Sequence, residues 1–151
     1  FLYLQRNAFG GKISGRSFGV PPDRPARFNL SSLEPMLEEV HARLSGVVIE
    51  CLPYAEFITR YDRASALFYL DPPYWGCEVD YGKAMFGPED FETLATWMKS
   101  AKGKALMSIN DAPQIREIFA GFHMDEVQVT YTVAHKETAR GKRGELLIRN
   151  F

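Results

Sequence analysis

Two hydrophobic patterns alternate along most of this chain: apolar residues at helical spacing, and short runs of consecutive apolar residues. The clearest helical pattern lies at 33–44, where the apolar positions are Leu33, Met36, Leu37, Val40 and Leu44. Ser31 and Glu34 precede it at the spacing of a capping box, and Gly46 follows as a stop signal. These residues predict one amphipathic helix.

Beyond this helix, the two patterns predict strands and helices in turn. The expected elements are a strand at 47–51, a helix near 54–61, a strand at 66–70, a helix at 88–101, a strand at 105–109 and a short helix after Asp111. We expect Asp111 to cap this short helix, because Gln114 lies three residues later and Pro113 falls in its first turn.

The last part of the chain has a different pattern. Strands are expected at 127–133 and 145–149, and the basic, Gly-containing loop between them suits a hairpin better than a helical crossover. Continuous apolar runs such as 66–70 are typical of parallel strands that are buried on both faces. The sequence therefore predicts an α/β fold of three layers, with a mostly parallel sheet and an antiparallel hairpin at its C-terminal end.

Composition narrows the class of protein. The chain has 151 residues, of which 46% are hydrophobic and 25% charged, as expected for one globular domain. Its two cysteines, Cys51 and Cys77, lack the spacing of metal ligands, so we expect no metal and a reducing compartment. The first residues do not have the pattern of a leader, and no apolar run is long enough to span a bilayer. These features indicate a cytoplasmic protein that does not enter a membrane.

Charge is unevenly distributed. Residues 1–30 are rich in Gly and Pro and hold five basic residues and one acidic residue, a local charge of +4, whereas the whole chain has a net charge of -1. We expect irregular structure here and contact with nucleic acid, because Arg and Lys bind phosphates and Arg and Asn bind base edges. The residues best suited to DNA contact are Arg6, Asn7, Lys12 and Arg16. The alternative is a solvated basic loop.

The residues after the strand at 66–70 suggest a chemistry. Asp71 follows this strand directly, and ligands of open α/β sheets bind beyond the carboxyl ends of the strands. Pro72 and Pro73 fix two φ angles and remove two N–H donors, which stiffens the turn. Tyr74 then presents a flat ring. Trp75 and Phe86 flank the next loop, where they would shield a bound base or pack on the sheet edge.

The exocyclic amine of a nucleobase matches this set of groups. Its lone pair is conjugated into the ring, and the carboxylate of Asp71 and the carbonyl oxygen of Pro72 offer acceptors for its two hydrogens. A base in a duplex must first be flipped out, and the ring of Tyr74 can replace part of the lost stacking. The alternative is a rigid turn without function. The position after a predicted buried strand favours the catalytic interpretation.

With Asp71-Pro72-Pro73-Tyr74 in this position, the chain resembles the Dam-type adenine-specific DNA methyltransferases over nearly its whole length. Looser matches lie at 1–11, 18–21, 47–54, 108–111 and 145–148. The resemblance implies a Rossmann-like methyltransferase sheet and transfer of a methyl group from S-adenosylmethionine to the exocyclic amine of a flipped adenine. It also implies that 1–30 belongs to the target-recognition segment and that 31–151 is the catalytic domain.

The resemblance carries over to individual residues. It implies catalytic roles for Asp71, Pro72, Pro73 and Tyr74, cofactor binding by Asp71, Pro53 and Tyr54, and DNA contact by Arg6, Asn7, Lys12, Arg16 and Trp75. The implied partner is double-stranded DNA, with a restriction endonuclease as a possible counterpart in a bacterial or phage-encoded system. The family's Gly-containing cofactor loop does not occur in the sequence, so we expect a chain that lacks the first strands of its sheet. Pro53 stands where many relatives carry an acidic residue.

Two alternatives remain open at this point. The same turn would serve a methyltransferase that acts on an adenine in RNA or on a protein amide, because each substrate presents a planar conjugated nitrogen. The chain would also serve as a nucleic-acid-binding module without activity if it cannot bind the cofactor.

Overall fold

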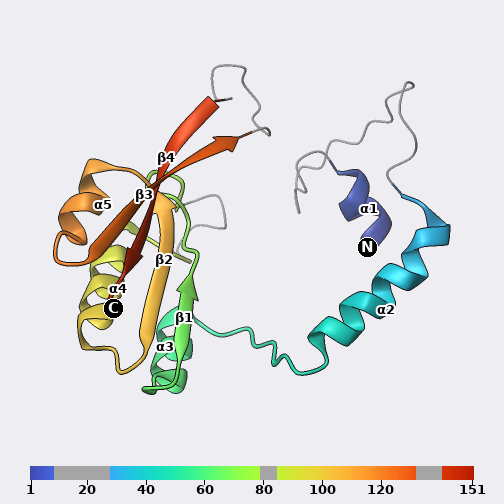
Figure 1. Ribbon diagram of the computed structural model, residues 1–151, viewed down its shortest axis with the longest axis horizontal. Coiled ribbons are helices and arrows are strands. Elements are labelled where there is room, and N and C mark those ends of the chain that lie inside the picture. The colour runs from blue at the N-terminus through green and yellow to red at the C-terminus, as the bar shows by residue number, and fades with distance from the viewer. Residues whose placement is uncertain (9–27, 79–84, 132–140) are drawn as a thin grey trace. The chain divides into compact units, whose positions relative to one another are not determined.

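The computed structural model describes residues 1–8, 28–78, 85–131 and 141–151 (Figure 1). The chain divides into two compact units, Phe1–Cys51 and Leu52–Phe151. This division lies after Cys51, so the amphipathic helix belongs to the first unit. The expected functional boundary between 1–30 and 31–151 stays a prediction.

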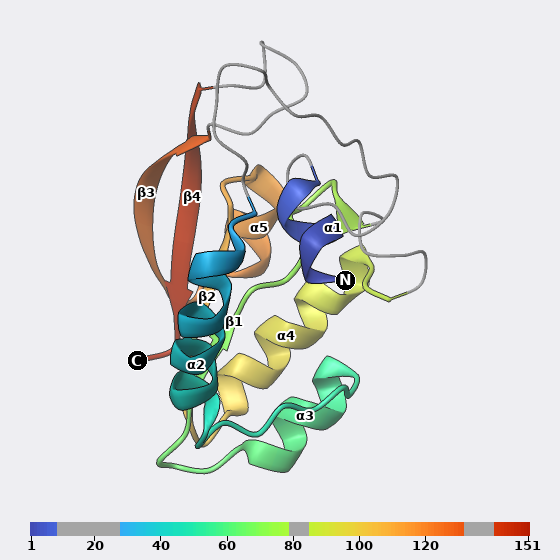
Figure 2. The same ribbon diagram turned by 90° about the vertical axis from the view of Figure 1, so that its right-hand side faces the viewer.

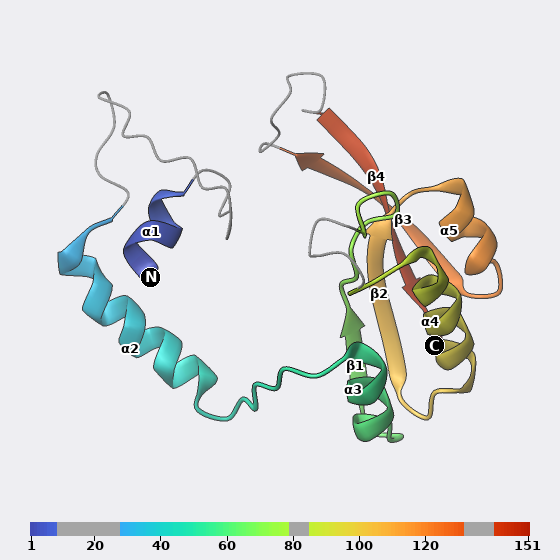
Figure 3. The ribbon, with the colours of Figure 1, turned by 180° about the vertical axis from the view of Figure 1, so that it is seen from behind.

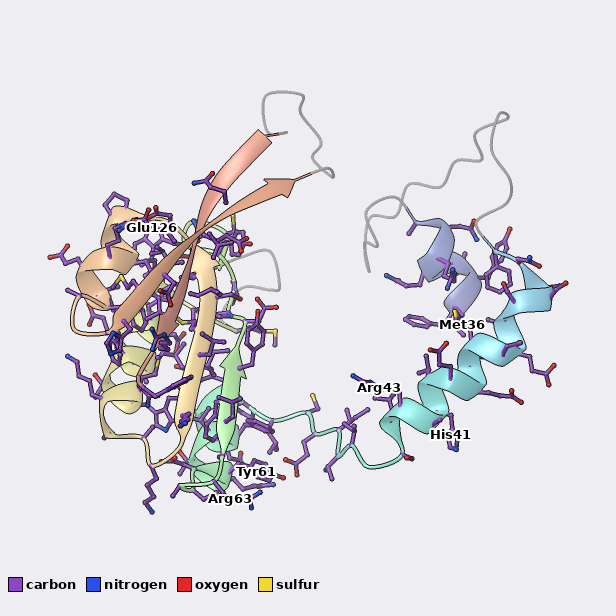
Figure 4. All side chains as sticks on the ribbon, viewed as in Figure 1. Met36, His41, Arg43, Tyr61, Arg63 and Glu126 are labelled. Carbon is purple, nitrogen blue, oxygen red and sulfur yellow. The ribbon has the colours of Figure 1, made fainter. Side chains whose placement is uncertain are left out.

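The regular secondary structure in the described part of the first unit is helical. These are α1 (Leu2–Asn7), the 3-10 turn η2 (Leu30–Ser32) and α2 (Leu33–Leu44). The guanidinium of Arg6 donates to the sulfur of Met36 at 3.0 Å, so α1 contacts α2 (Figure 4 labels Met36). The predicted helix at 33–44 is confirmed, whereas α1 lies where we expected irregular structure.

The predicted capping box of α2 is wrong. The side chain of Asn29 accepts a hydrogen bond from the Ser31 N–H at 3.0 Å, and Ser32, which is the N-cap of α2, makes no side-chain capping bond. The 3-10 turn places Ser31 before the helix rather than at its cap position, so Ser31 and Glu34 do not stand at the N-cap and N3 positions that the box requires.

The predicted strand at 47–51 is also wrong. These residues have no regular secondary structure, and Val48 and Ile49 are each 79% exposed. A strand forms only when its backbone N–H and C=O groups pair with a neighbouring strand. In the part of the chain that the structure describes, no strand pairs with this segment, so its apolar, β-branched composition does not suffice.

The second unit contains one sheet of four strands. They are β1 (Leu67–Leu70), β2 (Lys104–Asn110), β3 (His123–Tyr131) and β4 (Gly141–Arg149), in the order β1-β2-β4-β3. The C-terminal hairpin is confirmed, because β3 and β4 pair antiparallel. Only β1 and β2 pair parallel, since β4 returns beside β2 in the opposite direction. Among the described strands, the prediction of a mostly parallel sheet is therefore wrong.

Three helices cover one face of this sheet. They are α3 (Tyr54–Tyr61), α4 (Pro88–Ser100) and α5 (Pro113–Ile118), and Figures 2 and 3 show them on the same side of the strands. The helices and strands together supply the fully buried side chains of the core, which include Phe91, Met98, Met107, Ile109, Ile115, Phe119, Leu146 and Ile148. Burying these apolar groups is the main favourable contribution to folding of the unit.

The opposite face of the sheet is less covered. On β1, Phe68 is 6% exposed, but its neighbours Leu67 and Tyr69 are 67% and 63% exposed. Among the described residues, the 66–70 run is therefore buried on one face, and its expected burial on the other face stays a prediction. The described residues of this unit form a mixed α/β arrangement with one helical layer on one sheet (Figure 3).

The start of α5 differs from its prediction. Pro113 is in its first turn as expected, but Ala112 is the N-cap and makes no side-chain capping bond. The carboxylate of Asp111 instead accepts hydrogen bonds of 2.7 and 2.8 Å from the guanidinium of Arg116. These bonds hold the pKa of Asp111 below its ordinary value. Arg116 also donates to Glu126 of β3 at 2.6 Å (Figure 4 labels Glu126), which ties α5 to the sheet.

No helix in the described ranges is long and apolar enough to cross a membrane. Within the same ranges, the His, Cys, Asp and Glu side chains do not gather in a group of three that would hold a metal ion.

Candidate active site

The turn Asp71–Tyr74 leaves the carboxyl end of β1. Because β1 and β2 run parallel, the end of β2 at Asn110 lies on the same edge of the sheet. Glu145 of β4 pairs directly with Asn110 in the antiparallel register. The predicted position of the motif, just beyond a strand end, is confirmed, and three strands bring polar residues to it.

Asp71 is exposed, and one of its oxygens is held from β2. The hydroxyl of Ser108 lies 3.3 Å from Oδ1 of Asp71 in a hydrogen bond, and Ser108 itself is only 8% exposed. The Ser108 oxygen also shares a hydrogen bond of 2.8 Å with the hydroxyl of Tyr69. A carboxylate has about four acceptor positions, so this bond orients Asp71 without consuming its capacity to bind an amine.

The aromatic residue of the motif is anchored as well. Tyr74 is half-buried, and its hydroxyl donates to Oε1 of Glu145. After Tyr74 the chain turns sharply, because the N–H of Cys77 donates to the Tyr74 carbonyl at 2.8 Å. Gly76 has a φ of 85°, which residues with a side chain adopt only at a cost. The ring of Tyr74 is therefore held at both its hydroxyl and its backbone.

Trp75 packs into the unit rather than projecting from it. Its backbone is hydrogen-bonded to the Asn110 side chain, and its ring lies 5.4 Å from that of Phe91 between centroids. Phe91 contacts Phe86 at 4.9 Å, and Phe86 contacts Tyr54 at 5.6 Å. Of the two alternatives for Phe86, these contacts match packing. For Trp75 this contact matches the packing interpretation, and its DNA contact stays a prediction.

Two of the three residues predicted to bind the cofactor, Pro53 and Tyr54, lie at the start of α3. Pro53 is the N-cap of the helix and is exposed. Tyr54 is half-buried, and its hydroxyl donates to Asp90 of α4 at 2.5 Å. Burial and then the Asp90 carboxylate raise the pKa of Tyr54 above its ordinary value. Tyr54 and Trp75 therefore belong to one packed aromatic cluster, in which Phe86 and Phe91 lie between them.

The residues predicted to contact DNA are described only in part. Arg6 is exposed on α1, and Asn7, also on α1, donates from its amide to the Tyr3 carbonyl at 2.8 Å. Lys12 and Arg16 lie outside the described residues. Arg6 and Asn7 belong to the first unit and the motif to the second.

Sequence reasoning did not assign roles to Ser108, Asn110 and Glu145. Ser108 and Glu145 contact the motif, and Asn110 contacts Trp75, the residue that follows it. Their signal is an interruption of the apolar pattern. Ser108 and Asn110 alternate with the fully buried Met107 and Ile109, and Glu145 directly precedes the buried Leu146. Polar residues at these strand ends, on the edge that carries the motif, are candidates for holding it.

The amino-acid sequence around this site is similar to that of known proteins. The model of the D12 class N6 adenine-specific DNA methyltransferases matches residues 2–133. The chain belongs to this family. The match includes the motif at 71–74 as well as Ser108 and Asn110, and it spans the larger part of both units. The expected family is therefore confirmed.

One curated relative of this D12 class chain is the Type II methyltransferase M.CviBI of Paramecium bursaria Chlorella virus NC1A. It is 30% identical over 134 residues, which are 87% of this chain and 51% of the relative. The chain thus spans about half the length of the curated relative that it matches.

Proposed function

We propose that this chain carries the reacting groups of a DNA methyltransferase that methylates the exocyclic amine of adenine. The observation that carries the proposal is the turn Asp71–Tyr74 at the carboxyl edge of β1, within the part of the chain that matches the D12 class family. Activity on adenine in DNA is the property by which this family is described, and the turn offers the groups that such a reaction needs.

In the proposed reaction, the chain's own residues position the amine. The Asp71 carboxylate and the Pro72 carbonyl oxygen accept its two hydrogens, which directs the nitrogen lone pair away from the ring system. The Ser108 hydroxyl fixes the Asp71 carboxylate, and the contact with Glu145 fixes the ring of Tyr74 for stacking on the base. Catalysis then consists of orientation and of stabilising the positive charge that develops on the nitrogen.

The proposed cofactor is S-adenosylmethionine, which supplies an electrophilic methyl group when bound. The acceptor groups at the motif fit its methionine part, because the exposed carboxylate of Asp71 can bind the ammonium group there. For the adenosine end, the described residues offer the exposed Pro53 and a ring face of Tyr54, whose hydroxyl is bound to Asp90. Tyr54 would therefore contribute packing rather than a hydrogen bond.

The proposed substrate is double-stranded DNA with a flipped adenine. Arg6, Asn7, Lys12 and Arg16 would contact the duplex as part of a target-recognition segment at 1–30, and residues 31–151 would form the catalytic part. Trp75 would contribute to the wall beside the flipped base. Because the relative is named a Type II methyltransferase, we include a restriction endonuclease counterpart in the proposal.

The proposed fold is a Rossmann-like methyltransferase sheet with helices on both faces. The exposed side chains of Leu67 and Tyr69 on β1 support it, because parallel strands of α/β proteins are usually covered by helices on both faces.

A competition experiment tests the proposed function. The protein, expressed as its gene encodes it, is given tritiated S-adenosylmethionine with duplex DNA, structured RNA and a peptide in one reaction. We expect label in DNA alone, recovered as N6-methyladenine. Label in RNA or peptide would support the alternative substrates. Absence of label from all three, together with no binding of S-adenosylmethionine in calorimetry, would contradict the proposal.

A further inference from the structure

One side chain on β2 holds both polar backbone groups of the residue that follows the motif. The Trp75 N–H donates to Oδ1 of Asn110 at 2.8 Å, and Nδ2 of Asn110 donates to the Trp75 carbonyl at 3.3 Å. Asn110 is half-buried at the end of the strand, 35 positions away in sequence. A primary amide can make this pair of bonds because it presents a donor and an acceptor side by side.

The turn depends on such external bonds. Pro72 and Pro73 have no N–H, so these positions donate no hydrogen bond that would fix the turn. Ser108 holds Asp71 at the entrance of the turn, and Asn110 holds Trp75 at its exit. Ser108 and Asn110 are two residues apart on β2 and therefore share one face of the strand. β2 therefore holds the turn at its entrance and at its exit, and the bond of the Tyr74 hydroxyl to Glu145 adds a contact with β4.

We propose that Asn110 is a positioning residue for methyl transfer: its amide fixes the exit of the turn and thereby the aim of the Pro72 carbonyl and the Tyr74 ring. This inference rests on the proposed function. Asn110 does not touch the reacting atoms. Its loss would let the turn pivot about Asp71, and small displacements of positioned groups reduce the rate of the chemical step more than they reduce substrate binding.

The chain contains a matched control. Asn150 makes the same kind of bonds at the opposite end of β2: its Oδ1 accepts from the Ala105 N–H at 2.8 Å, and its Nδ2 donates to the carbonyls of Met98 and Gly103 at 3.1 and 3.2 Å. Asn150 is half-buried as well. The two residues thus have similar structural roles, but only the partner of Asn110 adjoins the motif.

The test compares Asn110→Ala and Asn150→Ala with wild type in the protein as its gene encodes it. Urea unfolding gives the stability of each, kcat and KM come from N6-methyladenine formation in duplex DNA, and NMR gives the exchange rate of the Trp75 amide. We expect similar losses of stability for both variants. Only Asn110→Ala should lower kcat, by tenfold or more with KM for DNA within threefold, and accelerate exchange of the Trp75 amide.

A wild-type kcat in folded Asn110→Ala would overturn the positioning role while leaving the proposed function intact. An equal fall of kcat in Asn150→Ala would also overturn it, because the effect would then follow stability alone. Wild type that forms no N6-methyladenine would overturn the proposed function and this role with it. Where Asn110→Ala does not fold, Asn110→Asp replaces it, since it keeps the acceptor and loses the donor: a threefold or larger fall of kcat supports the role, and a wild-type kcat overturns it.

Discussion

The hydroxyl of Tyr74 donates a hydrogen bond to the carboxylate of Glu145, 71 positions further along the chain. The carboxylate of Asp71 is held by Ser108, 37 positions away. Neither partner could be found from the motif itself, because local spacing predicts contacts within an element and says little about pairing between distant strands. What the sequence could predict at this scale is the turn, since two consecutive prolines after an apolar strand restrict the backbone by themselves.

The Tyr74 contacts lead to a prediction for Tyr74→Phe. This variant keeps the ring that we propose stacks on the base but removes the hydroxyl bond to Glu145. We expect a loss of about 1.5 kcal/mol in the free energy of urea unfolding, as for a hydrogen bond to a charged group. The fall in kcat should be several-fold and smaller than that of Tyr74→Ala. If Phe and Ala at this position gave equal rates of methylation, the proposed stacking role of the ring would be wrong.

Elements differed in how well the sequence predicted them. The helices at 54–61 and 88–101 and the C-terminal hairpin follow from local periodicity and turn residues, and all three are confirmed. The segment 47–51 has a strand composition but no paired neighbour among the described strands, and its prediction was wrong. Asp111 had the residue type and position of a cap, yet Arg116 competes for its carboxylate. The sequence pattern thus shows where a strand or a cap can form, and the partners available in the folded chain decide whether it does.

The Asp111 pair links α5 to the sheet and gives a prediction about pH. Because the pKa of Asp111 is held below 3.8, its contribution to stability is present above that pH and is lost as the pH falls through the lowered value. Arg116→Met should therefore be less stable than wild type at neutral pH, with a difference that shrinks in acid. Urea midpoints across pH, with NMR titration of the Asp111 carboxyl carbon, measure both effects.

Arg60→Met is the control for this pair. It removes the exposed ion pair with Glu56 inside α3, whose atoms lie 2.6 Å apart, and should leave the Asp111 titration unchanged. A stability difference between wild type and Arg116→Met that stays constant down to strongly acidic pH would contradict the assigned role of Asp111.

At the scale of the whole molecule, the family match spans the larger part of both compact units, whereas the packed core and the motif lie in Leu52–Phe151. The class of fold was predictable as α/β, because helical and strand patterns alternate. The order and the relative directions of the strands could not be predicted, since the place of β4 between β2 and β3 depends on long-range pairing. The prediction of the family from the sequence rested mainly on the four residues of the motif at 71–74. These four residues are a strong signal only because an apolar strand could be recognised directly before them.

Hydrogen exchange across the whole chain tests the corrected assignment of 47–51. Amides of β2, which pairs on both sides with β1 and β4, should exchange slowest. Amides of 47–51 should exchange quickly, because Val48 and Ile49 are each 79% exposed and lie outside any ladder in the described structure. Protection of this segment equal to that of β2 would show that it is a strand after all.

The central claim is that the carboxylate of Asp71 activates the amine for methylation, and Asp71→Asn tests it most directly. This change keeps the size of the side chain and an acceptor for Ser108 but removes the negative charge. Asp125→Asn, an exposed position in β3, serves as the control. We predict that Asp71→Asn lowers kcat for N6-methyladenine formation in duplex DNA about a hundredfold while its urea midpoint stays near that of wild type. Methylation by folded Asp71→Asn at the wild-type rate would contradict the account.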